Sequence, residues 1–184
     1  MKQGDLNIKR GFTIIEVSLV IAIAGLIFLM AFIALPSLQR SQRDARRRDD
    51  VLTFLEEVKK YQTNNRGALP AGPGGAMFLV DMDIAHHMNT SWGKFYSKYL
   101  GENFTDPDGT RYKLQITTCA TATGEACGAQ YSSGSITKMD YRMYVVVQAK
   151  CSGDESTGVV KSSNPRSLAV LYRLEGSGVY CANT

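Results

Sequence analysis

The architecture of this chain follows from one stretch near its start, Lys9-Arg10-Gly11-Phe12-Thr13-Ile14-Ile15-Glu16. It joins a short basic leader to an apolar run, and from Val17 to Gln39 there are 23 consecutive uncharged residues. That is more than the roughly 18 that indicate a spanning helix. A helix over residues 12–35 would be about 36 Å long, enough to cross the hydrocarbon of a bilayer. The sequence therefore predicts one membrane helix.

Glu16 is the one ionisable residue in that apolar segment. A carboxylate inside a membrane helix is costly, so its presence indicates a function by default. The plainer interpretation is that Glu16, about one turn from the helix start, reaches the membrane interface and is favoured by the helix dipole. Both interpretations stay open from these residues alone.

The order Gly11, Phe12, Glu16 and then about twenty apolar residues resembles the class III signal of type IV pilins and pseudopilins. The close match covers residues 9–35. The resemblance implies that a prepilin peptidase cuts between Gly11 and Phe12 and N-methylates Phe12. It also implies that Glu16 pairs with the terminal amine of a neighbouring subunit, an attraction that is strong in a dry filament core. We assign the helix kink to Pro36, which lies about one turn later than the kinking proline usual in that family.

Two other interpretations of the apolar segment compete with this one. Lys2, Lys9 and Arg10 could be the basic region of a secretory signal cut after the small-x-small sequence Ala22-Ile23-Ala24. The mature protein would then begin with an apolar run from Gly25 onward, which does not suit a soluble domain. Separately, Ser18, Ala22 and Gly25 form a small-residue face that would serve any helix packing.

The helix is expected to continue over residues 37–66. Its polar part, 39–50, suggests either a spine shared with neighbouring subunits or a solvated helix with weak Arg–Asp pairs. Beyond it, apolar residues spaced for one face of a helix predict packing on a sheet, before a stop at 64–67. They are Val51, Leu52, Leu55 and Val58, followed by Tyr61 or Gln62.

Charge is unevenly placed along the chain, although the formal net charge is only +4. Residues 40–50 hold five arginines and three aspartates, whereas from Val51 onward 13 Lys/Arg nearly balance 12 Asp/Glu. The head therefore gives no compositional sign of nucleic-acid binding. By the positive-inside rule, the arginines would keep the C-terminal domain in the cytoplasm. The resemblance and the cysteines favour export, and the conflict stays open in the sequence.

Residues 67–107 form a connector with one aromatic cluster and one strong turn. The aromatic residues suit core packing, with an adhesive surface patch as the alternative; they are Trp92, Phe95, Tyr96 and Tyr99, with Leu100 beside them. Asp106-Pro107-Asp108-Gly109 has the composition of a β-turn. It also resembles the turn that opens the sheet in many pilins, near which some of them bind calcium. His86-His87 lacks the spacing of a metal site, so we expect no metal there.

Alternating apolar residues predict three strands, at about 112–118, 139–149 and 168–174, and a short edge strand at 179–181. We expect an antiparallel meander with one buried face, covered by the amphipathic end of the long helix. The predicted fold class is therefore α+β: a long N-terminal helix on an antiparallel sheet, as in type IV pilins.

Four cysteines lie beyond the membrane helix, at Cys119, Cys127, Cys151 and Cys181. An even number in an exported domain indicates two disulfides, although four cysteines allow three pairings. We favour Cys119–Cys127 and Cys151–Cys181, because the second ties the C-terminal tail to the sheet. The absence of a Cys-x-x-Cys pair disfavours zinc.

No pattern of an enzyme, and no cofactor motif, is visible in the sequence. The residues and the resemblance together predict a subunit of an extracellular type IV pilus that serves adhesion, twitching motility or DNA uptake. The length suits a major subunit and also fits a minor one. Its expected partners are copies of itself, the prepilin peptidase, the assembly platform with its ATPases, the membrane before assembly, and a host-surface or DNA ligand. The alternatives are a pseudopilin of a secretion system and a monomeric anchored surface-binding domain.

This prediction divides the chain into four parts. They are a cleaved leader, 1–11; a transmembrane assembly helix, 12–36; its amphipathic continuation, 37–66; and a head, 67–184, made of the connector, 67–107, and a sheet with a disulfide loop, 108–184.

Overall fold

The structure is a computed structural model, and it describes residues 11–72, 78–81, 83–119, 127, 141–153, 158–176 and 178–184. The chain forms two compact units, Met1–Gln39 and Arg40–Thr184. One helix, α1 (Ile14–Asn64), contributes residues to both units, so the single long helix is confirmed. The assigned helix runs through Pro36. A kink at this proline stays a prediction.

The end of α1 follows from a left-handed turn. Arg66 and Gly67 have φ values of 55° and 81°, and the Gly67 N–H donates to the carbonyl oxygen of Gln62 at 2.7 Å. Glycine adopts this backbone conformation at little cost, which makes it the usual residue just past a helix. The predicted stop is therefore confirmed.

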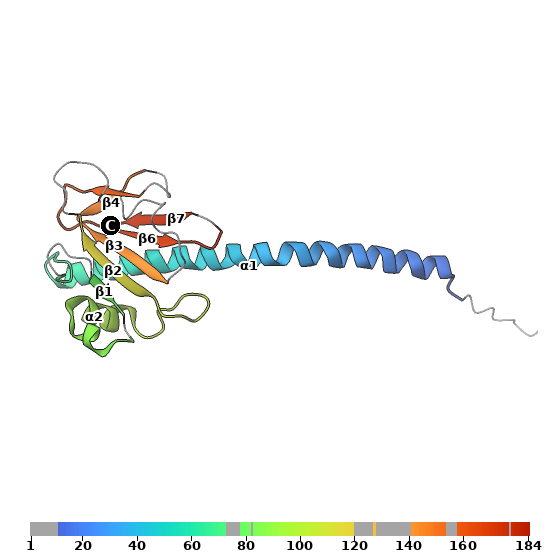
Figure 1. Ribbon diagram of the computed structural model, residues 1–184, viewed down its shortest axis with the longest axis horizontal. Coiled ribbons are helices and arrows are strands. Elements are labelled where there is room, and N and C mark those ends of the chain that lie inside the picture. The colour runs from blue at the N-terminus through green and yellow to red at the C-terminus, as the bar shows by residue number, and fades with distance from the viewer. Residues whose placement is uncertain are drawn as a thin grey trace, which may run out of the picture. The chain divides into compact units, whose positions relative to one another are not determined.

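A five-stranded sheet forms the centre of the second unit, in the order β1-β2-β3-β6-β7 (Figure 1). A separate hairpin pairs β4 with β5. The strands are β1 (Phe78–Val80), β2 (Lys113–Thr118), β3 (Arg142–Val147), β4 (Ala149–Cys151), β5 (Val159–Lys161), β6 (Leu168–Arg173) and β7 (Val179–Asn183). The α+β fold class is thus as expected, and the sheet is mostly antiparallel.

The predicted meander is wrong at one pair, because β2 and β3 run parallel. Alternation along a strand fixes which side chains share a face, but it does not fix the direction of the neighbouring strand. A parallel pair needs a crossover of a dozen or more residues, and the segment between Thr118 and Arg142 is long enough. The sequence also missed β1, β4 and β5, each of which has three residues.

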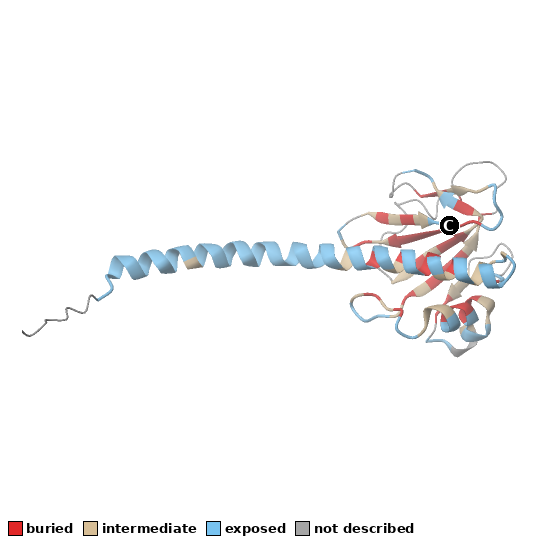
Figure 2. Ribbon diagram, turned by 180° about the vertical axis from the view of Figure 1, so that it is seen from behind, coloured by how far each residue is buried: buried red, intermediate tan, exposed pale blue. Residues whose placement is uncertain are grey.

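Both faces of the sheet are buried, which corrects the expectation of one buried face. On one side, Val51, Phe54, Leu55 and Val58 of α1 pack in the main core (Figure 2). On the other side, a second cluster includes Val146, Ala169 and Leu171 from the sheet, Ala149 and Val159 from the hairpin, and three of the cysteines. Central strand β6 accordingly has five consecutive buried residues.

The register of the α1 stripe also differs by one residue from the prediction. Phe54 is fully buried, whereas Leu52 is 45% exposed. Buried positions 51, 54, 55 and 58 follow the i, i+3, i+4, i+7 spacing of one helix face. Leu52 therefore faces away from the sheet.

The aromatic cluster of the connector packs into the core, as the favoured interpretation predicted. It belongs to two short helices, α2 (Ser91–Phe95) and η2 (Tyr96–Leu100), which follow η1 (Ala85–Asn89). Trp92, Phe95 and Tyr96 are at most 1% exposed. The Phe95 ring meets the rings of Phe54 and Tyr61 edge-on at 5.8 and 5.6 Å between centroids. The alternative of an adhesive patch is therefore wrong for these three rings.

Gly93 is expected to tolerate no side chain, because a Cβ there would lie 2.0 Å from the carbonyl oxygen of His87. We expect Gly93→Ala to lower the free energy of unfolding by about 1–3 kcal/mol or more, the usual cost of overpacking. Thermal unfolding of the purified full chain measures this. Gly72→Ala is the matched control, since its Cβ would make an ordinary 3.6 Å contact with Trp92. Equal stability of the two variants would contradict the prediction.

Candidate functional site

The first unit exposes an apolar surface that is unusual for a soluble monomer. Every large apolar residue described from Phe12 to Leu38 is at least 48% exposed, and all are drawn pale blue in Figure 2. The apolar segment has no buried residue, and by length and composition it is able to cross a membrane. This surface needs either lipid or other protein around it.

Thr13 caps the start of α1, and this local geometry fixes the position of Glu16. The Thr13 Oγ1 accepts a hydrogen bond from the Glu16 backbone N–H at 3.2 Å, as the first half of a Thr-x-x-Glu capping box does. Within the described part of the chain, the Glu16 carboxylate forms no ion pair. The Glu16 backbone therefore takes part in the cap of the helix, and its carboxylate is available to another partner.

Other polar groups of this segment bond within the helix. The Ser18 hydroxyl donates to the Ile15 carbonyl at 2.9 Å and the Ser37 hydroxyl to the Ala34 carbonyl at 2.8 Å. Such internal bonds leave no hydroxyl unsatisfied in an apolar surrounding. Nothing lies within 4 Å of a Cβ built on Gly25, so this position is open to the close approach of another helix.

The carboxylate and the small residues lie on opposite sides of the helix. At about 100° per residue, Ser18, Ala22 and Gly25 cluster on one face, and Glu16 lies roughly 160–180° away from Ser18 and Gly25. The segment therefore has two different faces, one with a charge and one with little side-chain volume.

Arg47 of α1 anchors the helix to the head in the second unit. Its side chain is 1% exposed, and Nε and Nη2 donate to the two oxygens of Asp106 at 2.6 and 2.9 Å. Nη2 also donates to Glu175 at 2.9 Å, and Nη1 to Asp44 at 3.0 Å. Burial opposes the charge of Arg47, but the bonds to Asp106 and Glu175 outweigh it and raise its pKa. Three carboxylates thus hold one buried guanidinium.

Further hydrogen bonds extend this cluster to the sheet and its last turn. Arg43 contacts both oxygens of Glu175, with its Nη2 at 2.7 Å from Oε2. Asp44 accepts the backbone N–H groups of Glu175 and Gly176 at 2.9 and 2.8 Å. The Tyr172 hydroxyl donates to Asp106 at 3.0 Å. We call Arg43, Asp44, Arg47, Asp106 and Glu175 the anchor cluster.

The anchor cluster corrects the interpretation of residues 39–50 as a polar helix outside the head. Asp44 does pair with Arg47 at i,i+3, as the sequence suggested, but the principal partners come from Asp106 and Glu175, 59 and 128 residues away. Two of the five arginines are therefore neutralised by the head. The positive-inside rule counts Lys/Arg and not net charge, so this pairing leaves the conflict over orientation open.

Asp106 also closes the turn that the sequence predicted. The Gly109 N–H donates to the Asp106 carbonyl at 2.8 Å, and the Asp108 N–H to its carboxylate at 3.2 Å. The turn is confirmed. Its aspartate binds an arginine and a tyrosine, which gives the Asp-Pro-x-Gly sequence a structural role; calcium near it stays an untested alternative. Elsewhere in the connector, His87 makes a structural contact, because its Nδ1 accepts a hydrogen bond from the Asp81 backbone N–H at 3.0 Å.

The stability of the head is expected to fall in acid through Glu175. Its bond from Arg43 lowers the pKa of the Glu175 carboxyl below the ordinary 4.5, with burial opposing the shift. A lowered pKa contributes stability above the unfolded value, and this contribution is lost as the pH falls through the folded value. The thermal midpoint, measured from about pH 7 to pH 3, should therefore fall once the pH is below about 4.5. The fall should be less steep in Glu175→Gln. An equal slope in both proteins would contradict this.

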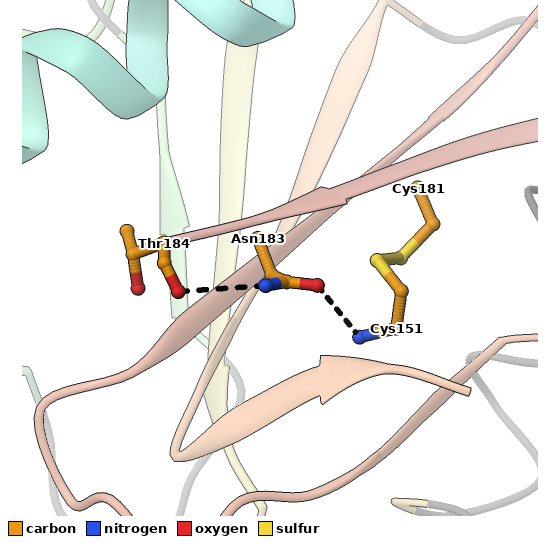
Figure 3. Close-up of a disulfide and its surroundings, with 4 residues drawn as sticks. All are labelled: Cys151, Cys181, Asn183 and Thr184. Carbon is orange, nitrogen blue, oxygen red and sulfur yellow. Dashed lines mark hydrogen bonds between the residues drawn. A yellow bond between two sulfur atoms is a disulfide. The ribbon is translucent and has the colours of Figure 1, made fainter. Parts of the chain in front are cut away.

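Both disulfides that the sequence favoured are present, Cys119–Cys127 and Cys151–Cys181. The second closes 30 residues and joins β4 to β7 (Figure 3). Beside it, the Cys151 N–H donates to Asn183 Oδ1 at 3.2 Å. The C-terminal strand is thus tied to the hairpin that covers the sheet. Such crosslinks are typical of domains outside the cytoplasm.

No family model, no curated protein and no solved structure matches the chain. Function has to be inferred from the site itself. Cleavage at Gly11, methylation of Phe12 and charge pairing of Glu16 stay predictions. Asp106 and Glu175 are the site residues that the sequence did not identify as partners of the helix.

Proposed function

We propose that the chain is the structural subunit of an extracellular filament of the type IV pilus kind. One observation carries the proposal: an unbroken, exposed apolar helix with a single carboxylate that has no ion-pair partner in the described chain. A membrane would cover the apolar surface before assembly, and copies of the same helix would cover it afterwards. An amine on a partner subunit would also satisfy the charge.

Processing supplies the complementary charge. Cleavage between Gly11 and Phe12 by a prepilin peptidase would create a new amino group four residues before Glu16. That amino group would lie near Glu16 of its own chain, but in the filament the Glu16 carboxylate would pair with the amine of the adjacent subunit as that subunit is inserted. In an interior of low dielectric, such a pair is strongly preferred over an unpaired carboxylate. N-methylation keeps that positive charge.

The two faces of the helix support an open assembly. A contact between different faces of identical subunits is heterologous, and it yields rings or helical filaments. Here the face with Glu16 would meet the face with Ser18, Ala22 and Gly25, where small side chains permit close approach. Repetition of this contact would produce a helical bundle of apolar segments.

The head would lie on the outside of the filament. The two disulfides support export of the second unit. We place the precursor in the cell membrane as a single-pass protein and the mature subunit on the cell surface. The role is structural and not enzymatic, and it requires an assembly platform with its ATPases.

Fractionation of the producing cells tests this function. Filaments are sheared from the surface, and antibody against the head is used to label them in electron micrographs. We expect labelling along the whole filament, and none on cells that lack the chain. If the chain were found only in membranes, the filament proposal would be overturned and a monomeric anchored domain favoured. A small amount of chain at the surface, with no sheared filaments, would favour a pseudopilin.

A further inference from the structure

An open pocket of about 480 Å³ lies on the head at the end of α1. We propose that it binds an acidic monosaccharide, either a sugar acid or a sugar phosphate. Its lining comes from the last turns of α1, the turn after it, the loop before β6 and the final residue described; the residues are Lys59, Gln62, Thr63, Gly67, Asn164, Arg166 and Thr184. Pockets of 300–1,000 Å³ are typical of small-molecule sites.

The charge of the lining favours an anion. Lys59 and Arg166 are exposed cations, and neither forms an ion pair within the described residues. None of the lining side chains is acidic. The adjacent cation of α1 does have a partner, because Lys60 pairs with Glu57. A carboxylate or phosphate in the pocket would therefore supply the counter-charge for Lys59 and Arg166.

The backbone of Arg166 is held in place before any ligand arrives. Its N–H donates to Asn164 Oδ1 at 2.9 Å, and its carbonyl accepts from Gln62 Nε2 at 2.8 Å. Its guanidinium lies over Gly67, where Nη1 would be only 2.6 Å from a Cβ. A side chain at position 67 would displace it. A backbone that is already ordered lowers part of the entropic cost of binding.

Neutral groups around the two cations suit the hydroxyls of a sugar. Asn164 Nδ2 is an amide donor, and Gln62 Oε1 is an amide acceptor whose partner Nε2 is already bonded. The Thr63 hydroxyl donates to the Lys59 carbonyl at 2.9 Å and keeps its lone pairs. Donors and acceptors thus alternate beside the cations. An inorganic anion would use only part of this lining.

Isotope-labelled full chain in a non-ionic detergent is the protein to test, with the backbone amide shifts of residues 67 and 166 as the readout. The probes are glucuronate, glucose 6-phosphate, glucose and inorganic phosphate. We expect at least one of the two acidic sugars to bind with a Kd of the order of 1 mM, and glucose to bind at least about tenfold more weakly. Binding of glucuronate alone or glucose 6-phosphate alone identifies the source of the charge.

The double variant Lys59→Gln/Arg166→Gln is expected to bind the acidic sugar about tenfold more weakly, or weaker still. Lys60→Gln is the matched control and should bind as the unmodified chain does. A third variant, Arg166→Lys, keeps the charge but loses the planar guanidinium over Gly67, and should bind with intermediate affinity. All three positions are exposed, so unchanged unfolding curves are expected and verify the fold.

Several results would overturn the proposal: equal binding of glucose, inorganic phosphate as tight as either acidic sugar, or no loss of affinity in the double variant. The proposal does not depend on filament assembly, because the readout is binding to the head of the unassembled chain. A chain that binds the sugar but forms no filament would therefore contradict only the proposed function.

Discussion

Replacing Arg47 with alanine is expected to lower the free energy of unfolding of the head by about 3–5 kcal/mol, the range for removing one partner of a buried ion pair. Three carboxylates surround Arg47, and Asp106 is itself fully buried. Without the guanidinium they would repel one another in a poorly solvated site. The loss is larger than a surface salt bridge would give, which is typically below about 1 kcal/mol.

Urea unfolding of the full chain in detergent, followed by tryptophan fluorescence, measures this loss because Trp92 is buried in the core of the head. Arg46→Ala is the matched control: it removes an exposed arginine from the adjacent position of α1. We expect the control to change stability by less than about 0.5 kcal/mol. If Arg47→Ala and Arg46→Ala were equally stable, Arg47 would not be the anchor between helix and sheet.

Glu16→Gln is expected to abolish filaments while leaving the head folded. The amide keeps nearly the same size, but it cannot neutralise the terminal amine of a neighbour. If the association of each pair of subunits weakened by about 3 kcal/mol, its equilibrium constant would fall by more than about 100-fold, and this weakening would recur at every subunit. Thr13 would still cap the helix through the backbone N–H of residue 16.

Filament yield after shearing, compared with the total amount of chain in the cells, measures the effect. Glu56→Gln is the control, because it removes an exposed carboxylate from α1 outside the apolar segment. It should assemble normally. Normal filaments from Glu16→Gln would show that the carboxylate only occupies the membrane interface, which was the plainer interpretation of this residue.

The long helix and the disulfides could be predicted from the sequence because their signals are local or few. The apolar run is continuous, the Asn-Arg-Gly stop has a backbone reason, and four cysteines allow only three pairings. Core packing of the aromatic cluster could be predicted as well, since rings at helical spacing are most often buried. These features depend little on where distant parts of the chain meet.

The sheet order and the anchor cluster could not be predicted in the same way. Period-two alternation gave the faces of β2 and β3 but not their parallel direction. Arg47 stands among four other arginines, and no local pattern indicates that this one is buried. Its partners Asp106 and Glu175 are identified only when the turn before β2 and the turn after β6 come together beside α1.

Mass spectrometry of the N-terminal peptide from sheared surface material tests the central claim most directly. We predict a peptide that begins with N-methylated Phe12, abundant in the sheared fraction, because only the processed terminus supplies the charge that Glu16 needs. An intact Met1 terminus would contradict the claim and leave an anchored domain. A terminus at Gly25 would contradict it too, and would identify a conventionally secreted protein.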